Sequence, residues 1–187
     1  KLIPFSISAE GRNERLWGYI VSGNYFDVLG IQPALGRFFL PEDDEAPGKH
    51  PVVVLSHGLW QRRFGGSRGV LGRQLTLNGQ PFTIVGVAPQ SFYGVNLGLR
   101  PEIFAPQMME DVLMSFDTLE ERNNRSHFAM ARLQSGASVE EARAALDVLA
   151  KRLQETYPDS NQGISFNVLP EAKGGVHPMM RGGFMGF

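Results

Sequence analysis

The sequence contains no cysteine among its 187 residues. This excludes disulfides, thiolate metal sites, iron–sulfur clusters and a cysteine nucleophile. The formal net charge is only −1, so there is no bulk attraction to nucleic acid, which needs a clustered basic surface. No run of about 18 apolar residues occurs, so no segment of this sequence is predicted to span a bilayer. The longest aliphatic run, residues 52–55, has the length of a buried strand.

What the sequence does contain is ordinary for a globular domain, with 42% hydrophobic and 20% charged residues. Its length suits one domain, or two small interlocked ones, with enough residues to bury a core. It begins at Lys1 without an initiator methionine and without the apolar stretch of a secretory signal. We therefore expect this sequence to be a piece of a longer protein.

Alternation of apolar residues predicts strands along the first two thirds of the chain. Residues 15–22 carry apolar side chains on both faces, which favours a central strand. The pair Asn78–Gly79 predicts a hairpin, because a type I′ turn needs positive φ at both central positions. Prolines bracket residues 101–106, which favours an edge strand there. Further strands are predicted over 51–56, 74–77 and 82–87, and short helices over 25–29, 57–64 and from about 110 to 121.

The clearest helix signal begins at Ser138, which forms a capping box with Glu141. One apolar stripe follows at three- and four-residue spacing, and Pro158 ends the helix. The members of the stripe are Ala142, Leu146, Leu149, Leu153 and Tyr157. The flanking segments 127–133 and 164–169 alternate like strands, so this region is predicted to form a β-α-β unit.

Ser56 is the most suggestive catalytic residue, because it lies where a predicted strand meets a predicted helix. The Gly-x-Ser-x-Gly pattern of a nucleophile elbow is absent, since Val54 stands where its first glycine is needed. His57 does not face Ser56 on a helix and is a poor base for it. Capping of the helix by Ser56 is favoured, and a hydrolase that uses Ser56 stays open as the alternative.

No metal or cofactor site is predicted. The histidines do not pair at the i,i+3 or i,i+4 spacing of a helical metal site; they are His50, His57, His127 and His177. Residues 43–45 are acidic but lack the spacing of a calcium loop, so a solvated loop is favoured. The glycine-rich residues 64–69 lack the Lys-Ser/Thr of a phosphate loop. A free ligand-binding module stays open as a further alternative.

Two loops are predicted to form a candidate contact surface. One is the glycine- and aromatic-rich loop 89–100, in which Phe92 and Tyr93 are large apolar residues available for contact with a partner. The other is the acidic loop, represented by Glu42, Asp43 and Asp44.

An ordered set of short motifs is more specific than the composition of a globular domain. The set comprises 18–30 (GYIVSGNYFDVLG), 36–39 (GRFF), 52–56 (VVVLS), 60–65 (WQRRFG), 72–73 (GR), 77–79 (LNG), 85–87 (VGV) and 131–133 (ARL), with Gly136, Ala142, Leu149 and Tyr157-Pro158. This order resembles the periplasmic core domain of MacB-type ABC transporter permeases over about residues 15–170. It is most similar to the duplicated orphan permeases of acidobacteria, which carry the domain twice without a fused ATPase.

The resemblance implies an α+β fold in a single extracytoplasmic domain fragment. A porter-like β-α-β part would comprise residues 1–22 and 126–170, and a more β-rich subdomain would be inserted over 23–125. The tail 171–187 would lead toward a transmembrane helix.

The resemblance also implies the setting and partners of the domain. It would lie on the periplasmic side of the inner membrane, attached through flanking membrane helices outside this sequence. A separate ATP-binding subunit and a periplasmic adaptor would be its partners. Its role would be non-enzymatic, coupling movement of the membrane helices to the handling of substrate or partner.

Overall fold

The computed structural model describes residues 1–9, 12–95, 100–114 and 119–170. The chain divides into two compact units. The barrel unit comprises the described residues of 1–94, 99–121 and 126–128, and the helical unit comprises Val95 and residues 122–125 and 129–170. Each unit is described by itself below. The mixture of strands and helices in the described chain confirms the predicted α+β class.

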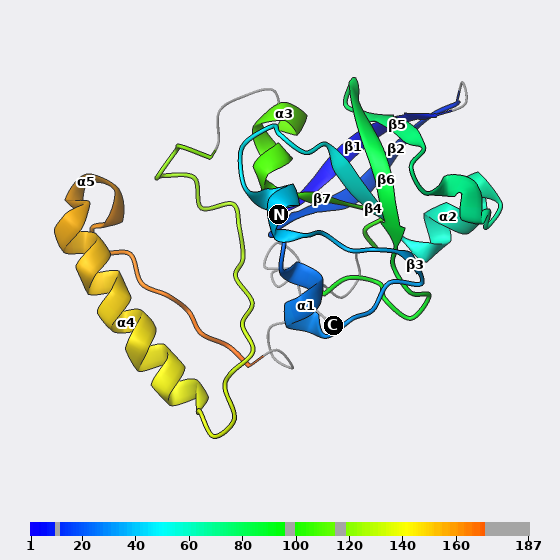
Figure 1. The fold of residues 1–187 in the computed structure, drawn as a ribbon. Coiled ribbons are helices and arrows are strands. Elements are labelled where there is room, and N and C mark those ends of the chain that lie inside the picture. Colours follow the sequence, from blue (N-terminus) through cyan, green and yellow to red (C-terminus); the bar gives the residue numbers. More distant parts are fainter. Residues whose placement is uncertain (10–11, 96–99, 115–118, 171–187) are drawn as a thin grey trace, which may run out of the picture. The chain divides into compact units, whose positions relative to one another are not determined.

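All strands of the described chain lie in one sheet of the barrel unit, in the order β3-β6-β4-β7-β2-β1-β5 (Figure 1). They are β1 (Leu2–Ala9), β2 (Arg12–Val21), β3 (Leu35–Gly36), β4 (Val52–Leu55), β5 (Gln74–Leu77), β6 (Gln80–Val87) and β7 (Ile103–Pro106). Because β5 also pairs with β6, every strand except β3 belongs to a closed ring. A closed ring gives each of these strands a partner on both sides.

Strand β6 closes the ring by using both of its edges. Along one edge it pairs antiparallel with β5 and then with β3, and along the other it runs parallel to β4. A Cβ atom at Gly86 would lie 1.9 Å from the carbonyl oxygen of Arg37. Only glycine therefore allows the chain after β3 to approach β6 this closely.

The predicted hairpin is confirmed. Asn78 and Gly79 adopt φ values of 48° and 85° and join β5 to β6, with Leu77 opposite Gln80. The central position predicted for residues 15–22 is also confirmed, because β2 pairs with β1 on one side and β7 on the other.

The edge strand predicted over 101–106 is wrong, because β7 lies between β2 and β4 and is buried along its whole length. Pro101 precedes the strand and Pro106 is its last residue. Both prolines therefore lie at strand boundaries, where the missing N–H groups do not interrupt the pairing.

Alternate side chains of the ring strands fill the barrel and form its main core. This set includes Phe5, Ile7, Leu16, Leu55, Leu75, Leu77, Phe82, Ile84 and Ile103. The opposite faces of β2, β4 and β7 carry a second cluster, in which the rings of Phe26 and Phe38 stack with centroids 3.8 Å apart. Helix α1 (Tyr25–Leu29) supplies Phe26 and is thereby packed on the outside of the barrel.

Short helices cover the rest of the barrel unit. They are η1 (Pro41–Asp44), α2 (His57–Phe64), η2 (Arg68–Val70), η3 (Gln107–Met109) and α3 (Glu110–Met114). Of the helix predicted from about 110 to 121, the structure describes Glu110–Met114 as α3; residues 115–118 lie outside the described part, and residues 119–121 are not helical.

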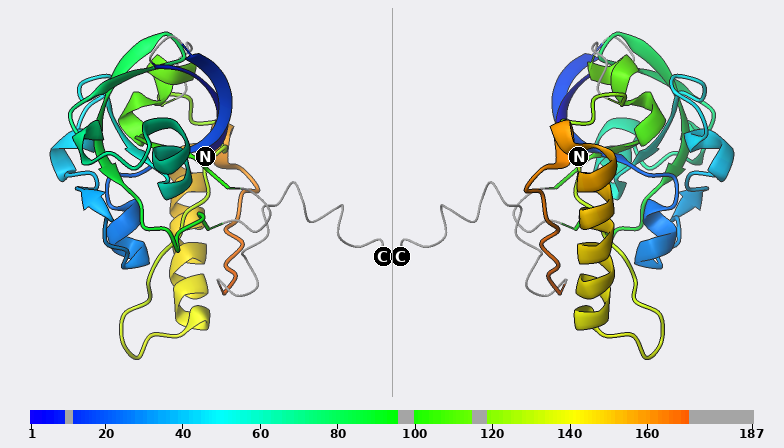
Figure 2. Two further views of the ribbon diagram at one scale, coloured as in Figure 1. Left: turned by 90° about the vertical axis from the view of Figure 1, so that its right-hand side faces the viewer. Right: turned by 90° about the vertical axis from the view of Figure 1, so that its left-hand side faces the viewer.

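The helical unit contains α4 (Val139–Thr156) and α5 (Pro158–Asn161). The predicted capping box is confirmed, since Ser138 Oγ accepts a hydrogen bond from Glu141 N at 3.1 Å and Glu141 accepts one from Ser138 N. Figure 2 shows residues 164–170 running beside α4, whose Gln154 side chain donates to the carbonyl of Ile164 at 2.9 Å.

The strands predicted over 127–133 and 164–169 are wrong as secondary structure. Neither segment is a strand or pairs with one in the described chain. Alternation of apolar residues shows which side chains share a face, whereas a strand also needs a neighbour for its main-chain groups.

The expected division into a porter-like part and an insertion stays a prediction, and the two compact units have other bounds. Residues 1–22 supply β1 and β2 of the same barrel that contains residues 52–106, and residues 126–128 belong to this unit too. The tail 171–187 lies outside the described residues. No helix in the described part of the chain has the length and hydropathy needed to cross a membrane.

Candidate functional site

The acidic loop forms a structural anchor through Asp43. This side chain is only 4% exposed and lies 2.5 Å from Arg37, while its carboxylate also accepts a hydrogen bond from Leu40 N at 2.8 Å. Asp43 thus holds the start of η1 and cannot serve as part of an exposed contact surface.

Asp44 joins three separate segments. Its Oδ2 atom accepts a hydrogen bond from Gly23 N at 2.7 Å, and its Oδ1 atom accepts one from Met108 N at 2.9 Å. Gly23 lies just before α1, Asp44 ends η1, and Met108 lies in η3. The carboxylate therefore fastens these elements to one another, and of the three predicted acidic contact residues only Glu42 is exposed.

In loop 89–100, one of the two predicted contact residues packs inside the unit and the other is exposed. Phe92 is half-buried, with ring centroids 5.7 Å from Phe104 and 6.0 Å from Phe26. Tyr93 is 51% exposed, and the guanidinium carbon of Arg100 lies 4.7 Å from its ring centroid. Cation–π stacking of this kind holds an exposed aromatic ring in place. Tyr93 and Arg100 are thus the solvent-facing part of this loop.

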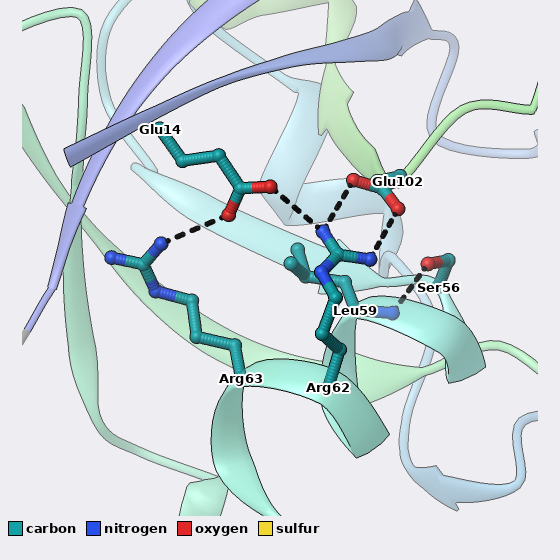
Figure 3. Close-up of polar contacts among 6 residues, drawn as sticks. All are labelled: Glu14, Ser56, Leu59, Arg62, Arg63 and Glu102. Atoms are coloured by element: carbon teal, nitrogen blue, oxygen red, sulfur yellow. Dashed lines mark hydrogen bonds and ion pairs between the residues drawn. The ribbon is translucent and has the colours of Figure 1, made fainter. Parts of the chain in front are cut away.

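Ser56 caps helix α2, as the sequence predicts. Its Oγ atom accepts a hydrogen bond from Leu59 N at 3.1 Å (Figure 3). The adjacent His57 ring instead packs edge-on against Trp60, with centroids 5.3 Å apart. The hydroxyl is therefore engaged by the helix terminus, and the neighbouring imidazole is directed to another contact.

A network of ion pairs at α2 was not predicted from the sequence. Arg62 binds both carboxylate oxygens of Glu102, at 2.7 and 2.8 Å, and also lies 3.0 Å from Glu14 (Figure 3). Arg63 reaches the other oxygen of Glu14 at 3.2 Å. Hydrogen bonding to Glu102 raises the pKa of Arg62 above its already high value.

This network connects α2 to β2 and to the residue before β7. It borders an open hollow of about 270 Å³ lined by Asn13, Glu14, Arg62 and Arg63. The two arginines are visible in the sequence as a basic helix end, but their acidic partners lie 40 to 49 residues away. No local spacing rule could have paired them.

A second polar cluster surrounds the fully buried carboxylate of Glu110. Lys1 Nζ lies 2.6 Å from one of its oxygens, and His127 Nε2 lies 2.8 Å from the other. Burial lowers the pKa of His127, although the carboxylate opposes this effect. The described residues include no group of three or more histidine or carboxylate side chains placed to bind a metal.

Loss of the Ser56 hydroxyl is expected to destabilise the fold modestly. Ser56→Ala leaves Leu59 N–H without its acceptor and should lower the free energy of unfolding by about 0.5–2 kcal/mol, whereas Ser56→Gly should cost only about a few tenths. Urea denaturation followed by tryptophan fluorescence measures both. Equal stability of Ser56→Ala and the unmodified chain would contradict the capping role.

Loss of one Asp44 oxygen is expected to weaken the attachment of the loops. Asp44→Asn retains one acceptor oxygen for two backbone N–H groups, so the free energy of unfolding should fall by roughly 1–3 kcal/mol. Glu42→Gln is the matched control on the exposed side of the same loop and should change it by less than about 0.5 kcal/mol. The same denaturation experiment compares them, and an equal effect of both variants would argue against the anchor.

Three comparisons place the chain among known proteins. Residues 3–149 match the family model described as the MacB-like periplasmic core domain. A probable syringafactin export ATP-binding/permease protein of Pseudomonas syringae pv. tomato is 40% identical over 67 residues, which are 36% of this chain and 10% of that protein. The chain thus matches only a tenth of the length of this relative.

Two solved structures share the fold. The periplasmic region of MacB from Actinobacillus actinomycetemcomitans superposes with a TM-score of 0.59 and 16% identity, over 92% of this chain and 70% of that one. The extracellular domain of the noncanonic ABC-type transporter YknZ from Gram-positive bacteria gives 0.60 and 15%, over 90% and 78%. With the family match over most of its length, the chain belongs to the family of MacB-like periplasmic core domains.

Proposed function

We propose that this chain is the extracytoplasmic part of an ABC-type transporter permease on the periplasmic side of the inner membrane. The family match over residues 3–149 carries this proposal. The export ATP-binding/permease relative supports a link to ATP-driven export. Membrane helices outside residues 1–187 and a separate ATP-binding subunit would complete the transporter, and a periplasmic adaptor is a further proposed partner.

The proposed role is non-enzymatic coupling of membrane-helix movement to events outside the membrane. The division of the chain into two compact units supports this role, since rigid-body displacement of units is a common way to transmit movement. The closed barrel supports it as well, because a ring without free edges moves as one body. The polar side chains at Ser56, Asp44 and Arg62 serve the fold, which leaves movement and contact as the proposed activities.

Contact with cargo or a partner is proposed for the exposed parts of the two loops. Tyr93, with Arg100 stacked on it, and Glu42 face solvent. The loops themselves are held by the ring contact of Phe92 with Phe104 and by the hydrogen bonds that Asp43 and Asp44 accept from backbone N–H groups.

Cysteine labelling tests the location. Glu42→Cys is suited to this because Glu42 is exposed, whereas a cysteine at Asp44 would break the anchor. In whole cells with a permeabilised outer membrane, a membrane-impermeant maleimide should label this variant of the full-length protein. The unmodified full-length protein gives the background. Reaction only after the inner membrane is broken would place the domain on the cytoplasmic side of that membrane and refute the proposal.

Distance measurements test the coupling. Spin labels at Glu42→Cys in the barrel unit and Lys151→Cys in the helical unit should change their separation when ATP is supplied to the assembled transporter. The pair Glu42→Cys and Arg68→Cys lies within the barrel unit and should keep its distance. Electron–electron double resonance measures both pairs. Identical distributions in both nucleotide states for the first pair would exclude coupling by movement of the units.

A further inference from the structure

The side chain of Asn78 holds the seam at which β1 meets β5. These two strands pair only over residues 7–8 of β1 and 76–77 of β5. Beyond them, Asn78 N donates to the carbonyl of Ser6 at 2.8 Å, and Asn78 Oδ1 accepts a hydrogen bond from Ser6 N at 2.7 Å. The side-chain oxygen thus takes the place of the main-chain acceptor that a longer β5 would supply.

The same side-chain amide fastens α3 to the turn. Asn78 Nδ2 donates to the carbonyl of Leu113 at 2.9 Å. The Leu113 side chain is buried in the main core of the barrel unit. One amide group therefore joins three parts of the barrel unit, namely β1, the turn between β5 and β6, and α3.

The backbone at this position restricts which residues can occupy it. Asn78 is the one non-glycine residue in the described chain with a positive φ. Besides asparagine, glycine and aspartate are the residues that adopt this conformation most readily. Glycine would supply neither side-chain hydrogen bond, and aspartate would place a carboxylate oxygen against the carbonyl of Leu113. Asparagine is the one of these three that fits both the conformation and the contacts.

This requirement places a reactive dipeptide at the seam, because Asn78–Gly79 is the single Asn-Gly pair of the sequence. In such a pair the main-chain nitrogen of glycine can attack Cγ of asparagine, since glycine has no side chain to hinder the approach. The new C–N bond closes a succinimide ring, and the bond from Cγ to Nδ2 breaks with loss of ammonia. Water then opens the ring at either carbonyl and leaves aspartate or isoaspartate.

The surroundings of Gly79 do not hinder this reaction. Gly79 is exposed, and a Cβ atom built there would meet nothing within 4 Å. The restraint acts on Asn78 instead, because Cγ has to swing onto the nitrogen of Gly79 and leave Ser6 and Leu113. Those contacts are lost together only when the seam opens. A reaction confined to an opened state is slowed by the rarity of that state.

We propose that Asn78–Gly79 is a masked modification site, which the closed barrel protects from deamidation and whose conversion prevents the seam from closing as before. Aspartate would replace the donor to the Leu113 carbonyl by a carboxylate oxygen. Isoaspartate would add a methylene group to the main chain of a turn that sets Leu77 opposite Gln80. This assignment goes beyond the proposed function and does not depend on what is transported.

Peptide mapping by mass spectrometry tests the protection. The purified full-length protein is kept in mildly alkaline buffer, folded or in urea, beside a synthetic peptide of residues 74–83, and conversion of Asn78 is followed with time. Conversion in the folded protein should be at least about tenfold slower than in the peptide, and urea should raise it to the rate of the peptide. Equal or faster conversion in the folded protein would mean that the hydrogen bond to Oδ1 activates the amide, and slow conversion in urea would mean that the fold is not what protects it. Either result overturns the assignment.

Asn78→Asp tests the consequence. In the full-length protein it should speed hydrogen exchange in the peptide that contains Ser6 by roughly tenfold, for the loss of one hydrogen bond. The matched control is Gln80→Glu, which adds the same charge at an exposed position of the same turn and should leave this exchange unchanged. Asn78→Gly keeps the positive φ without the side chain and should speed the exchange as well. Equal exchange in Asn78→Asp and Gln80→Glu would overturn the role of the seam. The labelling of Glu42→Cys is read separately, so failure here is distinguishable from failure of the proposed location.

Discussion

The main-chain pairing of β6 is the interaction on which the barrel unit depends. This strand meets β4 along one edge and β5 and β3 along the other, so it joins the two ends of what would otherwise be an open sheet. Attachment of β3 to this strand requires a bare backbone at Gly86, where the carbonyl of Arg37 approaches too closely for any side chain. Once the ring is closed, its interior is filled by alternate side chains from every ring strand, and the unit has a continuous core.

The helices outside the ring lack this continuous pairing; they pack on the barrel through apolar side chains and are also fastened by individual polar side chains. Asp44 joins the start of α1 to η3, and Arg62 joins α2 to β2 and to the residue before β7. In a sequence, charged residues such as these suggest a catalytic or binding role. In the structure, each of them forms hydrogen bonds that join elements of the barrel unit. Tyr93 and Glu42, by contrast, are exposed, which is why contact with a partner is proposed for them.

Features set by neighbouring residues could be predicted from the sequence, and features set by distant ones could not. The turn at Asn78–Gly79, the cap at Ser56 and the capping box at Ser138 each depend on about four residues, and all three are confirmed. The interior position of β7 depends on strands more than 45 residues away, and the prolines beside it suggested an edge. The family was recognisable from an ordered set of motifs, but the motifs did not show that residues 1–22 belong to the barrel.

The failed strand predictions at 127–133 and 164–169 follow from the contrast between the two units. The barrel supplies every ring strand with partners from its own sequence, whereas the helical unit has a well-capped helix but only one buried residue in it. Alternation of apolar residues in these two segments could not supply the main-chain partner that a strand also needs.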